Sequence, residues 1–198
     1  AIVIAKPPYW EVDNSPGGAI APGAQRLSAF APGPGDVGGT LGFVGRLDVA
    51  SSGLVLRAAG HEGLYHLQAQ RELGLLGREY VALCHGHMVP GQRRIASRIR
   101  RRTGGRSEVD ISGRPALTEL KVLSHLRRGA APLSLLALRI GTGRTHQIRC
   151  HLRSIGHPVV CDGRYGTGGD AAWCPRNFLH RHRLTFQDLE GQRRAARM

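Results

Sequence analysis

The chain has 198 residues, of which 41% are hydrophobic, and this composition excludes a disordered polypeptide and favours one compact domain. No apolar stretch approaches the roughly 20 residues that a membrane-spanning helix needs, and the apolar start Ala1–Ile4 is too short for a signal peptide. The formal net charge of +14 favours a polyanionic partner such as nucleic acid. Nearly all of the basic residues are arginines, since Lys6 and Lys121 are the only lysines. The alternative to a nucleic-acid partner is therefore that the positive charge reflects the base composition of the genome.

The first third of the chain predicts three extended segments, one irregular loop and one helix. Ala1–Ala5 is β-branched and ends at a Lys-Pro-Pro turn, which is typical of a first or edge strand. Residues 14–40 are crowded with Gly, Pro and Ala and predict an irregular loop. Phe43–Leu47 and Gly53–Ala58 read as extended segments on either side of a Ser-Ser-Gly turn, and Ala59–Leu73 has the leucine spacing of an amphipathic helix.

The rest of the chain is mostly strand. Alternation within Arg78–His85 predicts a strand with Tyr80, Ala82 and Cys84 on one face. Pro132–Ile140 is apolar at successive positions, which predicts a central strand buried on both faces. Ile148, Leu152 and Ile155 give Thr145–Ile155 the stripe of a helix that packs on a sheet. Further strands are expected at Ser107–Ile111, Ala116–Leu126 and Phe178–Phe186.

These elements predict an α+β fold with a mixed, mostly antiparallel central sheet, flanking helices and a single domain over residues 1–198. One segment, residues 91–107, is expected to form an arginine-rich hairpin or loop, because seven arginines and no acid lie between Arg93 and Arg106. This run is a candidate for contacts with a nucleic-acid backbone, and a solvated flexible hairpin is an equal alternative.

Cysteines and histidines do not predict a metal site. Cys84, Cys150, Cys161 and Cys174 form no C-x-x-C pair and match no zinc spacing. His146 and His151 are five residues apart, whereas a helical metal site uses a spacing of four. Reduced thiols without a disulfide pattern favour a reducing compartment inside the cell, either the cytoplasm or an organelle.

Gly45–Leu56 is the most informative segment for chemistry. It places one carboxylate, Asp48, at the end of an extended segment, followed by small residues, a glycine and an apolar strand. A carboxylate on such a turn can project into a cleft while the flanking strands hold it. An aspartate at a turn also commonly bonds its own backbone, so this segment alone leaves both readings open.

A second segment, Ile140–His151, joins a glycine turn to a helix that carries Arg149 and Arg153 on one face. An arginine on a helix that packs on a sheet is either a solvated charge or the partner of a buried acid. Tyr80, on its predicted strand, is a core or interface tyrosine if taken alone.

Together these segments resemble the RluA-type RNA pseudouridine synthases. The family pattern His-Arg-Leu-Asp, two variable residues, then Thr-Ser-Gly-Leu is similar to Gly45–Leu54, and Lys-x-Tyr-x-Ala is similar to Arg78–Ala82. Thr-Gly-Arg-Thr-His-Gln-Ile-Arg occurs unchanged at Thr142–Arg149. The resemblance continues through the motifs Ile4-Ala5-Lys6-Pro7-Pro8, Gly156-His157-Pro158, Asp162…Tyr165-Gly166 and Leu179-His180.

The resemblance implies a fold with an RNA cleft across a central antiparallel sheet, and chemistry without a metal or organic cofactor. It implies that Asp48 is the catalytic nucleophile or base, that Tyr80 is the active-site tyrosine and that Arg149 pairs with the aspartate. The implied partner is ribosomal or transfer RNA, with a ribosomal particle as a further candidate and no membrane. The expected RNA contacts are Arg46, Arg144, Thr145, His146 and Gln147, together with Arg100, Arg101 and Arg102 of the arginine run.

Several positions depart from the family pattern. Gly45 replaces the histidine that the family associates with opening an RNA helix, and Val49 and Ala50 replace a common charged pair. Arg78 replaces lysine, which preserves charge but not geometry. These changes leave an alternative function open, a catalytically silent synthase-like RNA-binding subunit of a ribosome or other large assembly.

Overall fold

In a computed structural model, the chain folds into two compact units. Unit 1 comprises Ala1–Arg78 and Arg181–Met198, and unit 2 comprises Glu79–His180. The prediction of a single domain over residues 1–198 stays a prediction. The structure describes residues 1–12, 24–27, 42–166 and 173–198.

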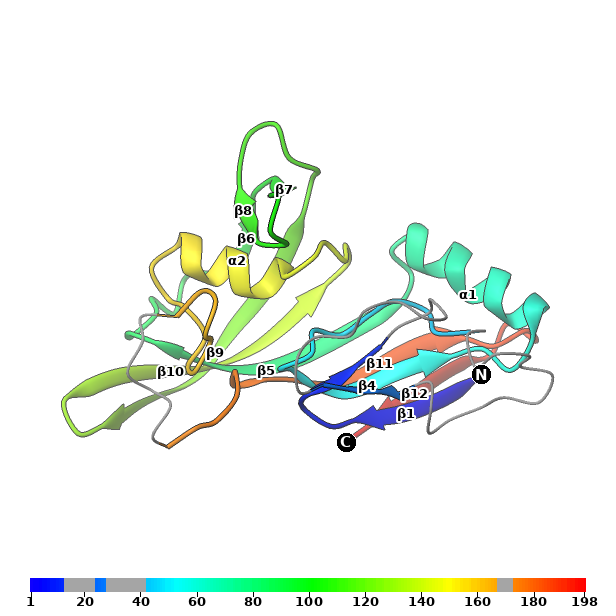
Figure 1. Cartoon of the computed structure of the whole chain (residues 1–198), viewed down its shortest axis with the longest axis horizontal. Helices are drawn as coiled ribbons and strands as arrows, with labels where there is room; N and C mark the ends of the chain where they lie inside the picture. The colour runs from blue at the N-terminus through cyan, green and yellow to red at the C-terminus, as the bar shows by residue number, and fades with distance from the viewer. Residues whose placement is uncertain (13–23, 28–41, 167–172) are drawn as a thin grey trace. The chain divides into compact units, whose positions relative to one another are not determined.

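Unit 1 contains antiparallel strands from the first 57 residues and from the C-terminal part of the chain (Figure 1). β1 (Ile2–Lys6) pairs with β4 (Ser52–Arg57), and β12 (Arg193–Arg197) pairs with β11 (Leu179–Gln187). β4 lies between β1 and β11, and every residue of it is buried, as expected for an interior strand. The predicted strands at Ala1–Ala5, Gly53–Ala58 and Phe178–Phe186 are therefore confirmed.

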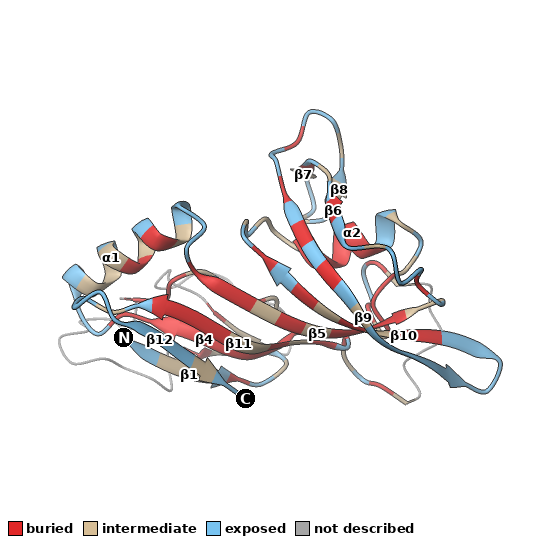
Figure 2. Cartoon of the chain, turned by 180° about the vertical axis from the view of Figure 1, so that it is seen from behind, coloured by how far each residue is buried: buried red, intermediate tan, exposed pale blue. Residues whose placement is uncertain are grey.

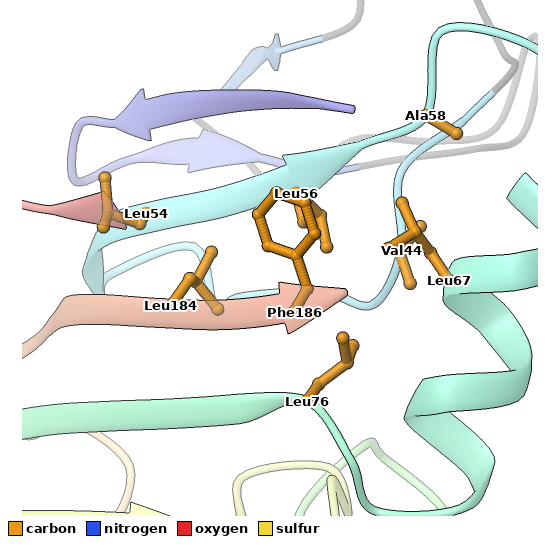
Figure 3. Close-up of a cluster of buried hydrophobic side chains, with 8 residues drawn as sticks. All are labelled: Val44, Leu54, Leu56, Ala58, Leu67, Leu76, Leu184 and Phe186. Atoms are coloured by element: carbon orange, nitrogen blue, oxygen red, sulfur yellow. The ribbon is translucent and has the colours of Figure 1, made fainter. Parts of the chain in front are cut away.

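Helix α1 (His61–Glu72) closes the core of unit 1 and confirms the helix predicted over Ala59–Leu73. Leu67 of α1 joins the core and is 2% exposed, and Leu64 packs against the same cluster. Figure 3 shows that the cluster draws on α1, β4, β11 and the connecting segments that carry Val44, Ala58 and Leu76. Its buried members are Val44, Leu54, Leu56, Ala58, Leu67, Leu76, Leu184 and Phe186.

The predicted irregular loop at residues 14–40 lies outside the described residues except for residues 24–27. There, β3 (Gln25–Arg26) pairs in parallel with β2 (Trp10–Glu11). The segment expected to be extended at Phe43–Leu47 runs along β4, where Phe43 forms an isolated bridge with Arg57 and the N–H of Val44 donates to the Leu56 carbonyl at 2.8 Å. It is not one of the named strands, and its residues lead into the Asp48 turn.

Unit 2 is built on a second set of antiparallel strands in the order β5-β10-β9-β6. Its longest strands are β9 (Leu117–Arg128) and β10 (Ala131–Ile140), which confirm the strands predicted over Ala116–Leu126 and Pro132–Ile140. β5 (Gly77–His85) confirms the strand predicted over Arg78–His85, and β6 is Arg94–Ala96. Figure 2 shows that the end of the β9–β10 hairpin is exposed.

An alternating row of charges crosses these strands on one face. Arg94 lies opposite Glu119, Glu119 lies opposite Arg139, and Arg139 lies opposite Glu79. Opposite charges at directly facing positions favour this pairing, and a slip of one residue would move them to the other face. The row therefore helps to specify the register of four strands.

Helix α2 (Gln147–Ser154) covers the other face and confirms the helix predicted over Thr145–Ile155. Thr118 of β9 lies opposite Ile140 of β10 and bonds to His151 of α2, so α2 lies on this face. The prediction that β10 is buried on both faces holds for part of the strand. Leu136 is fully buried on the α2 face, and on the opposite face Leu133 is buried in a cluster with Leu83 and Val160, whereas Arg139 is exposed.

The arginine-rich stretch contains three short strands, β6, β7 (Ile99–Arg101) and β8 (Ser107–Val109). β7 and β8 form a separate antiparallel pair, and β8 lies within the strand predicted at Ser107–Ile111. The β7–β8 pair overlaps residues 91–107, where an arginine-rich hairpin or loop was predicted. Sequence reasoning named no strand at β6 or β12, because arginine-rich segments lack the apolar alternation that predicts a strand. The α+β class, with mostly antiparallel strands and two flanking helices, is confirmed.

Candidate active site

Asp48 lies in unit 1 on a tight turn that enters β4. The carbonyl of Asp48 accepts a hydrogen bond from the N–H of Ser51 at 3.0 Å, which closes the turn. Asp48 is half-buried, Ser51 is fully buried, and Arg46 before them is exposed. The turn therefore leaves the aspartate partly accessible on a fixed backbone.

Lys6 of β1 holds this turn from one side. Its side chain is 1% exposed, and the ammonium donates to the carbonyls of Pro7 at 2.8 Å, Trp10 at 2.8 Å and Val49 at 3.1 Å. Val49 directly follows Asp48, so one buried cation joins the end of β1 to the peptide next to the aspartate. Hydrogen bonds are what make the burial of a charged side chain tolerable.

Arg181 of β11 contacts the same segment, and it is 5% exposed. Its Nη1 donates to the carbonyl of Leu54 at 3.1 Å, and its Nη2 donates to the carbonyl of Arg46 at 3.2 Å. The backbones also approach closely here, because a Cβ at Gly53 would lie 2.3 Å from the Arg181 carbonyl oxygen. With its φ of +121°, this position requires glycine.

Gly45 adopts a φ of +88°, a backbone region that side chains rarely occupy. A histidine at this position would be strained in the conformation that the chain adopts. The absence of the family histidine is thus matched by a local backbone that suits glycine.

Tyr80 lies in unit 2 on β5 and is 3% exposed. It faces Leu138 of β10, which in turn faces Leu120 of β9. Residues directly opposite one another share a face, so Tyr80 lies on the face that α2 covers. Tyr80 and the helix that carries Arg149 are therefore on the same side of this sheet, and the predicted face of Tyr80, Ala82 and Cys84 is buried.

Arg149 forms a buried, two-pronged ion pair with Asp162. Arg149 Nε lies 2.6 Å from Asp162 Oδ2 and its Nη2 lies 2.7 Å from Oδ1, with side chains that are 8% and 0% exposed. Asp162 Oδ1 also accepts the N–H groups of Arg164 and Tyr165, both at 3.0 Å. Of the two readings for Arg149, the buried one is correct, with Asp162 as an acid partner; its pairing with Asp48 stays a prediction.

The electrostatics of Asp162 favour its ionised form. Burial alone would raise the pKa of this carboxyl, but the hydrogen bonds and charge of Arg149, with the two backbone N–H groups, lower the pKa instead. Sequence reasoning did not select Asp162 as a site residue. The sequence did hold a signal for it, because Asp162 is the one acidic residue between Glu119 and Asp170 and so the one nearby carboxylate that could pair with Arg149.

Tyr165 connects this pair to the arginine hairpin. Its hydroxyl donates to the carbonyl of Ser107 at 3.0 Å and accepts the N–H of Ser107 at 2.7 Å. His146 Nδ1 lies 3.1 Å from the same oxygen, and the Arg149 guanidinium lies 5.0 Å from the centre of the ring. Burial raises the pKa of the Tyr165 hydroxyl, which keeps it protonated as a donor.

Much of the unchanged motif Thr142–Arg149 supports the fold. The Gln147 amide accepts from Thr142 Oγ1 at 2.8 Å and from the Arg144 N–H at 3.0 Å, and it donates to the Leu117 carbonyl at 2.9 Å. Arg144 Nε donates to the Pro115 carbonyl at 3.0 Å. The predicted RNA contacts of Arg144, Thr145, His146 and Gln147 stay predictions.

The arginine-rich segment, residues 91–107, contains no acid, but two acids that directly follow it, Glu108 and Asp110, pair with its arginines. Arg100 pairs with Glu108 at 3.1 Å and with Asp110 at 2.5 Å, and Arg102 pairs with Glu108 at 2.5 Å. Hydrogen bonds from Arg102 and then Arg100 lower the pKa of Glu108. Arg101 and Arg102 are both exposed, but Arg102 pairs with Glu108, which makes Arg101 the stronger candidate for a phosphate contact.

No group of three His, Cys, Asp or Glu side chains among the described residues could hold a metal ion. Neither described helix has the length and apolar character needed to cross a bilayer. All four cysteines are free thiols.

Comparison with known proteins identifies the family. Residues 1–154 match the family described as RNA pseudouridylate synthase. An uncharacterized RNA pseudouridine synthase of Synechocystis is 31% identical over 193 residues, which cover 93% of this chain and 58% of that protein. Ribosomal large subunit pseudouridine synthase D of Salmonella typhimurium is 36% identical over 127 residues, which cover 63% of this chain and 37% of that protein.

A solved structure agrees with these relatives. Human RNA pseudouridylate synthase domain containing 1 superposes with a TM-score of 0.71 and 28% identity over 79% of this chain and 67% of that one. The chain spans 58% and 37% of the lengths of the two relatives named above. The family match over residues 1–154 and this structural likeness agree with the motifs found in the sequence. The chain therefore belongs to the RNA pseudouridylate synthase family.

Proposed function

We propose that this chain isomerises uridine to pseudouridine in ribosomal or transfer RNA, with Asp48 as the catalytic nucleophile or base. The observation that supports this most directly is the family match over residues 1–154, which contains Asp48, Tyr80 and Arg149. The named Salmonella relative is a ribosomal large subunit pseudouridine synthase, which favours ribosomal RNA and a ribosomal particle as partner.

The reaction breaks the C1′–N1 glycosidic bond of uridine and joins C1′ to C5 of the same base. As a nucleophile, the Asp48 carboxylate adds to C1′ while the bond electrons leave with N1. The uracil then turns, C5 attacks C1′ and displaces the carboxylate, C5 loses its proton and N1 gains one. As a base, Asp48 instead removes the proton on C2′, whose electron pair forms a C1′=C2′ double bond while N1 leaves with the glycosidic pair; C1′ then joins C5, Asp48 returns the proton to C2′, C5 loses its proton and N1 gains one. Both routes require an ionised carboxylate at a fixed position, and the turn supplies a held backbone for it.

Tyr80 and Arg149 have supporting roles in this proposal. The target base must leave its stack before its sugar can react, and the ring of Tyr80 offers a π-face for the extruded uracil. Arg149 stabilises the ionised aspartate, and its own orientation is fixed by the bidentate pair with Asp162. A guanidinium carries five N–H donors, so one arginine can serve two carboxylates.

The target uridine is expected in an unpaired segment of RNA, because Gly45 has no side chain with which to open a helix. Arg46 and the residues Arg144, Thr145, His146 and Gln147 are the proposed contacts around the target nucleotide, and the arginine hairpin is the proposed contact to phosphates. The free thiols of all four cysteines support a reducing compartment inside the cell.

The test is site-mapped pseudouridine formation in cellular RNA treated with the wild-type chain, Asp48→Ala or the isosteric Asp48→Asn. Wild type should form pseudouridine at defined sites, and both variants should form none. Glu62→Ala, which removes an exposed acid at the start of α1, is the control and should retain the wild-type products. Product formed by Asp48→Ala would overturn the role of Asp48. RNA bound by wild type without any product would favour a catalytically silent binding subunit.

A further inference from the structure

Arg181 is a buried arginine in unit 1 that belongs to none of the family motifs found in the sequence. Its guanidinium lies between two parts of the chain that flank Asp48. One nitrogen donates to the carbonyl of Arg46, two residues before the aspartate, and the other donates to the carbonyl of Leu54, six residues after it. One rigid side chain therefore joins the entry to the turn with the start of the strand that leaves it.

The backbone of Arg181 fixes the same region. Gly53 is so close to it that a Cβ would lie 2.3 Å from the carbonyl oxygen and 2.6 Å from the nitrogen of Arg181. On its other side, Gly53 faces Lys6 in the pairing of β1 with β4, and Lys6 donates to the carbonyl of Val49. The turn is thus held on both sides by buried cations, one from each neighbouring strand.

The geometry points to Arg181 as a positioning residue for the Asp48 carboxylate, an inference that rests on the proposed function. A guanidinium suits this role because its two Nη donors diverge in a fixed plane and can hold two carbonyls at a set separation. A lysine ammonium is a single donor centre and can replace only part of this bridge. Arg181 need not touch the RNA for this role, because it acts through the backbone of the turn.

The prediction for kinetics is a selective loss of turnover. A misplacement of a reacting group by about 1 Å can cost about 100-fold in rate, so Arg181→Met should lower kcat by roughly that factor. KM for the RNA should change by less than about 3-fold, since RNA binding does not depend on the turn alone. The kcat of Arg181→Lys should lie between those of wild type and Arg181→Met, about 10-fold below wild type.

The control is Arg57→Met, which removes another buried arginine of the same unit, one whose guanidinium lies over the ring of Phe43. Compared at equal folded fractions, its kcat should stay within about 2-fold of wild type. The same kcat in Arg181→Met and wild type, or equal losses in Arg181→Met and Arg57→Met, would overturn the positioning role. If Arg181→Met does not fold, the same comparison is made with Arg181→Lys.

A second measurement does not depend on activity. The N–H of Ser51 closes the turn by its bond to the Asp48 carbonyl, so its hydrogen exchange reports how firmly the turn is held. Arg181→Met should speed this exchange by about 10-fold or more relative to Arg57→Met. Unchanged exchange would refute the inference even if wild type forms no pseudouridine, whereas faster exchange in an inactive chain would refute only the proposed function.

Discussion

Replacement of Asp162 by asparagine should destabilise the protein more than any surface charge change. The substitution preserves size but removes the negative charge that faces Arg149. The side chains of this pair are 8% and 0% exposed, so solvent screens the interaction little. Arg149 would remain buried without its carboxylate partner, and Oδ1 now accepts three hydrogen bonds that an amide cannot all reproduce.

The magnitude follows from the class of interaction. Breaking a buried ion pair by removing one partner costs about 3–5 kcal/mol, whereas an exposed pair contributes about 0–1 kcal/mol. Two charge-assisted hydrogen bonds at about 1.5–3 kcal/mol each give a similar total. The matched control is Glu72→Gln, because its pair with Arg71 joins side chains that are 70% and 35% exposed. We expect a loss below about 1 kcal/mol there.

Urea unfolding of wild type, Asp162→Asn, Arg149→Met and the double variant measures these losses. The double variant should be less destabilised than the sum of the single variants, because the second change removes a charge that the first left unpaired. Additive losses, or a loss below about 1 kcal/mol for Asp162→Asn, would refute the argument that this pair is stabilising.

The same pair predicts a pH dependence with a defined sign. The folded-state pKa of Asp162 is lowered: burial raises it, but the bonds and charge of Arg149 outweigh this. A carboxyl with a lowered pKa contributes stability that is present above its unfolded pKa of about 3.9 and is lost as pH falls through the folded value. The gap in unfolding free energy between wild type and Asp162→Asn should therefore be constant above about pH 5 and narrow below pH 4.

Three further predictions concern other parts of the chain. Gly53→Ala should cost about 2–4 kcal/mol in thermal or urea unfolding, because its Cβ would overlap the Arg181 backbone; a loss below about 1 kcal/mol would contradict the close approach. Arg101→Gln should lower the salt slope of RNA binding by about one, and Arg100→Gln should lower it less because Arg100 is already paired with acids; equal slopes would oppose this ranking. Burial lowers the pKa of His151, so NMR titration should find its imidazole still neutral at a pH where exposed histidines are half protonated. Because the unfolded chain then binds a proton that the folded chain does not, the free energy of unfolding should fall as pH drops below about 6.5; a His151 pKa above that value would contradict this prediction.

The sequence was sufficient to predict most strands and both helices, because their apolar periodicity records which face is buried. Helix α2 is the clearest case, since Ile148 and Leu152 predicted its packing face and are 4% and 0% exposed. Strand β12 was missed because three of its five residues are arginines. Its pairing with β11 supplies backbone hydrogen bonds whatever its side chains are, and no periodicity records such an edge strand.

The partners of the site residues were harder to predict than the residues themselves. Arg149 was selected from its motif, but its bond to Asp162 joins residues 13 positions apart, across the end of a helix and a turn. The clamp of Arg181 on the carbonyl of Arg46 spans 135 positions. Every residue type carries the same backbone carbonyl, so the partner of a side chain that bonds to a carbonyl cannot be recognised from residue types in the sequence.

The unchanged motif Thr142–Arg149 shows why identity to a family pattern does not by itself assign contacts with substrate. Gln147 bonds to the turn before it, His146 lies against Tyr165, and Arg149 is held by Asp162. These bonds give the fold a reason to require the same residues. At the Asp48 turn, Lys6 and Arg181 donate to the carbonyls of Val49 and Arg46, so these two contacts fix the path of the backbone whatever side chain follows Leu47. They account for how the turn is held, and the proposed role of the Asp48 carboxylate is tested separately by Asp48→Asn, which leaves both backbone contacts in place.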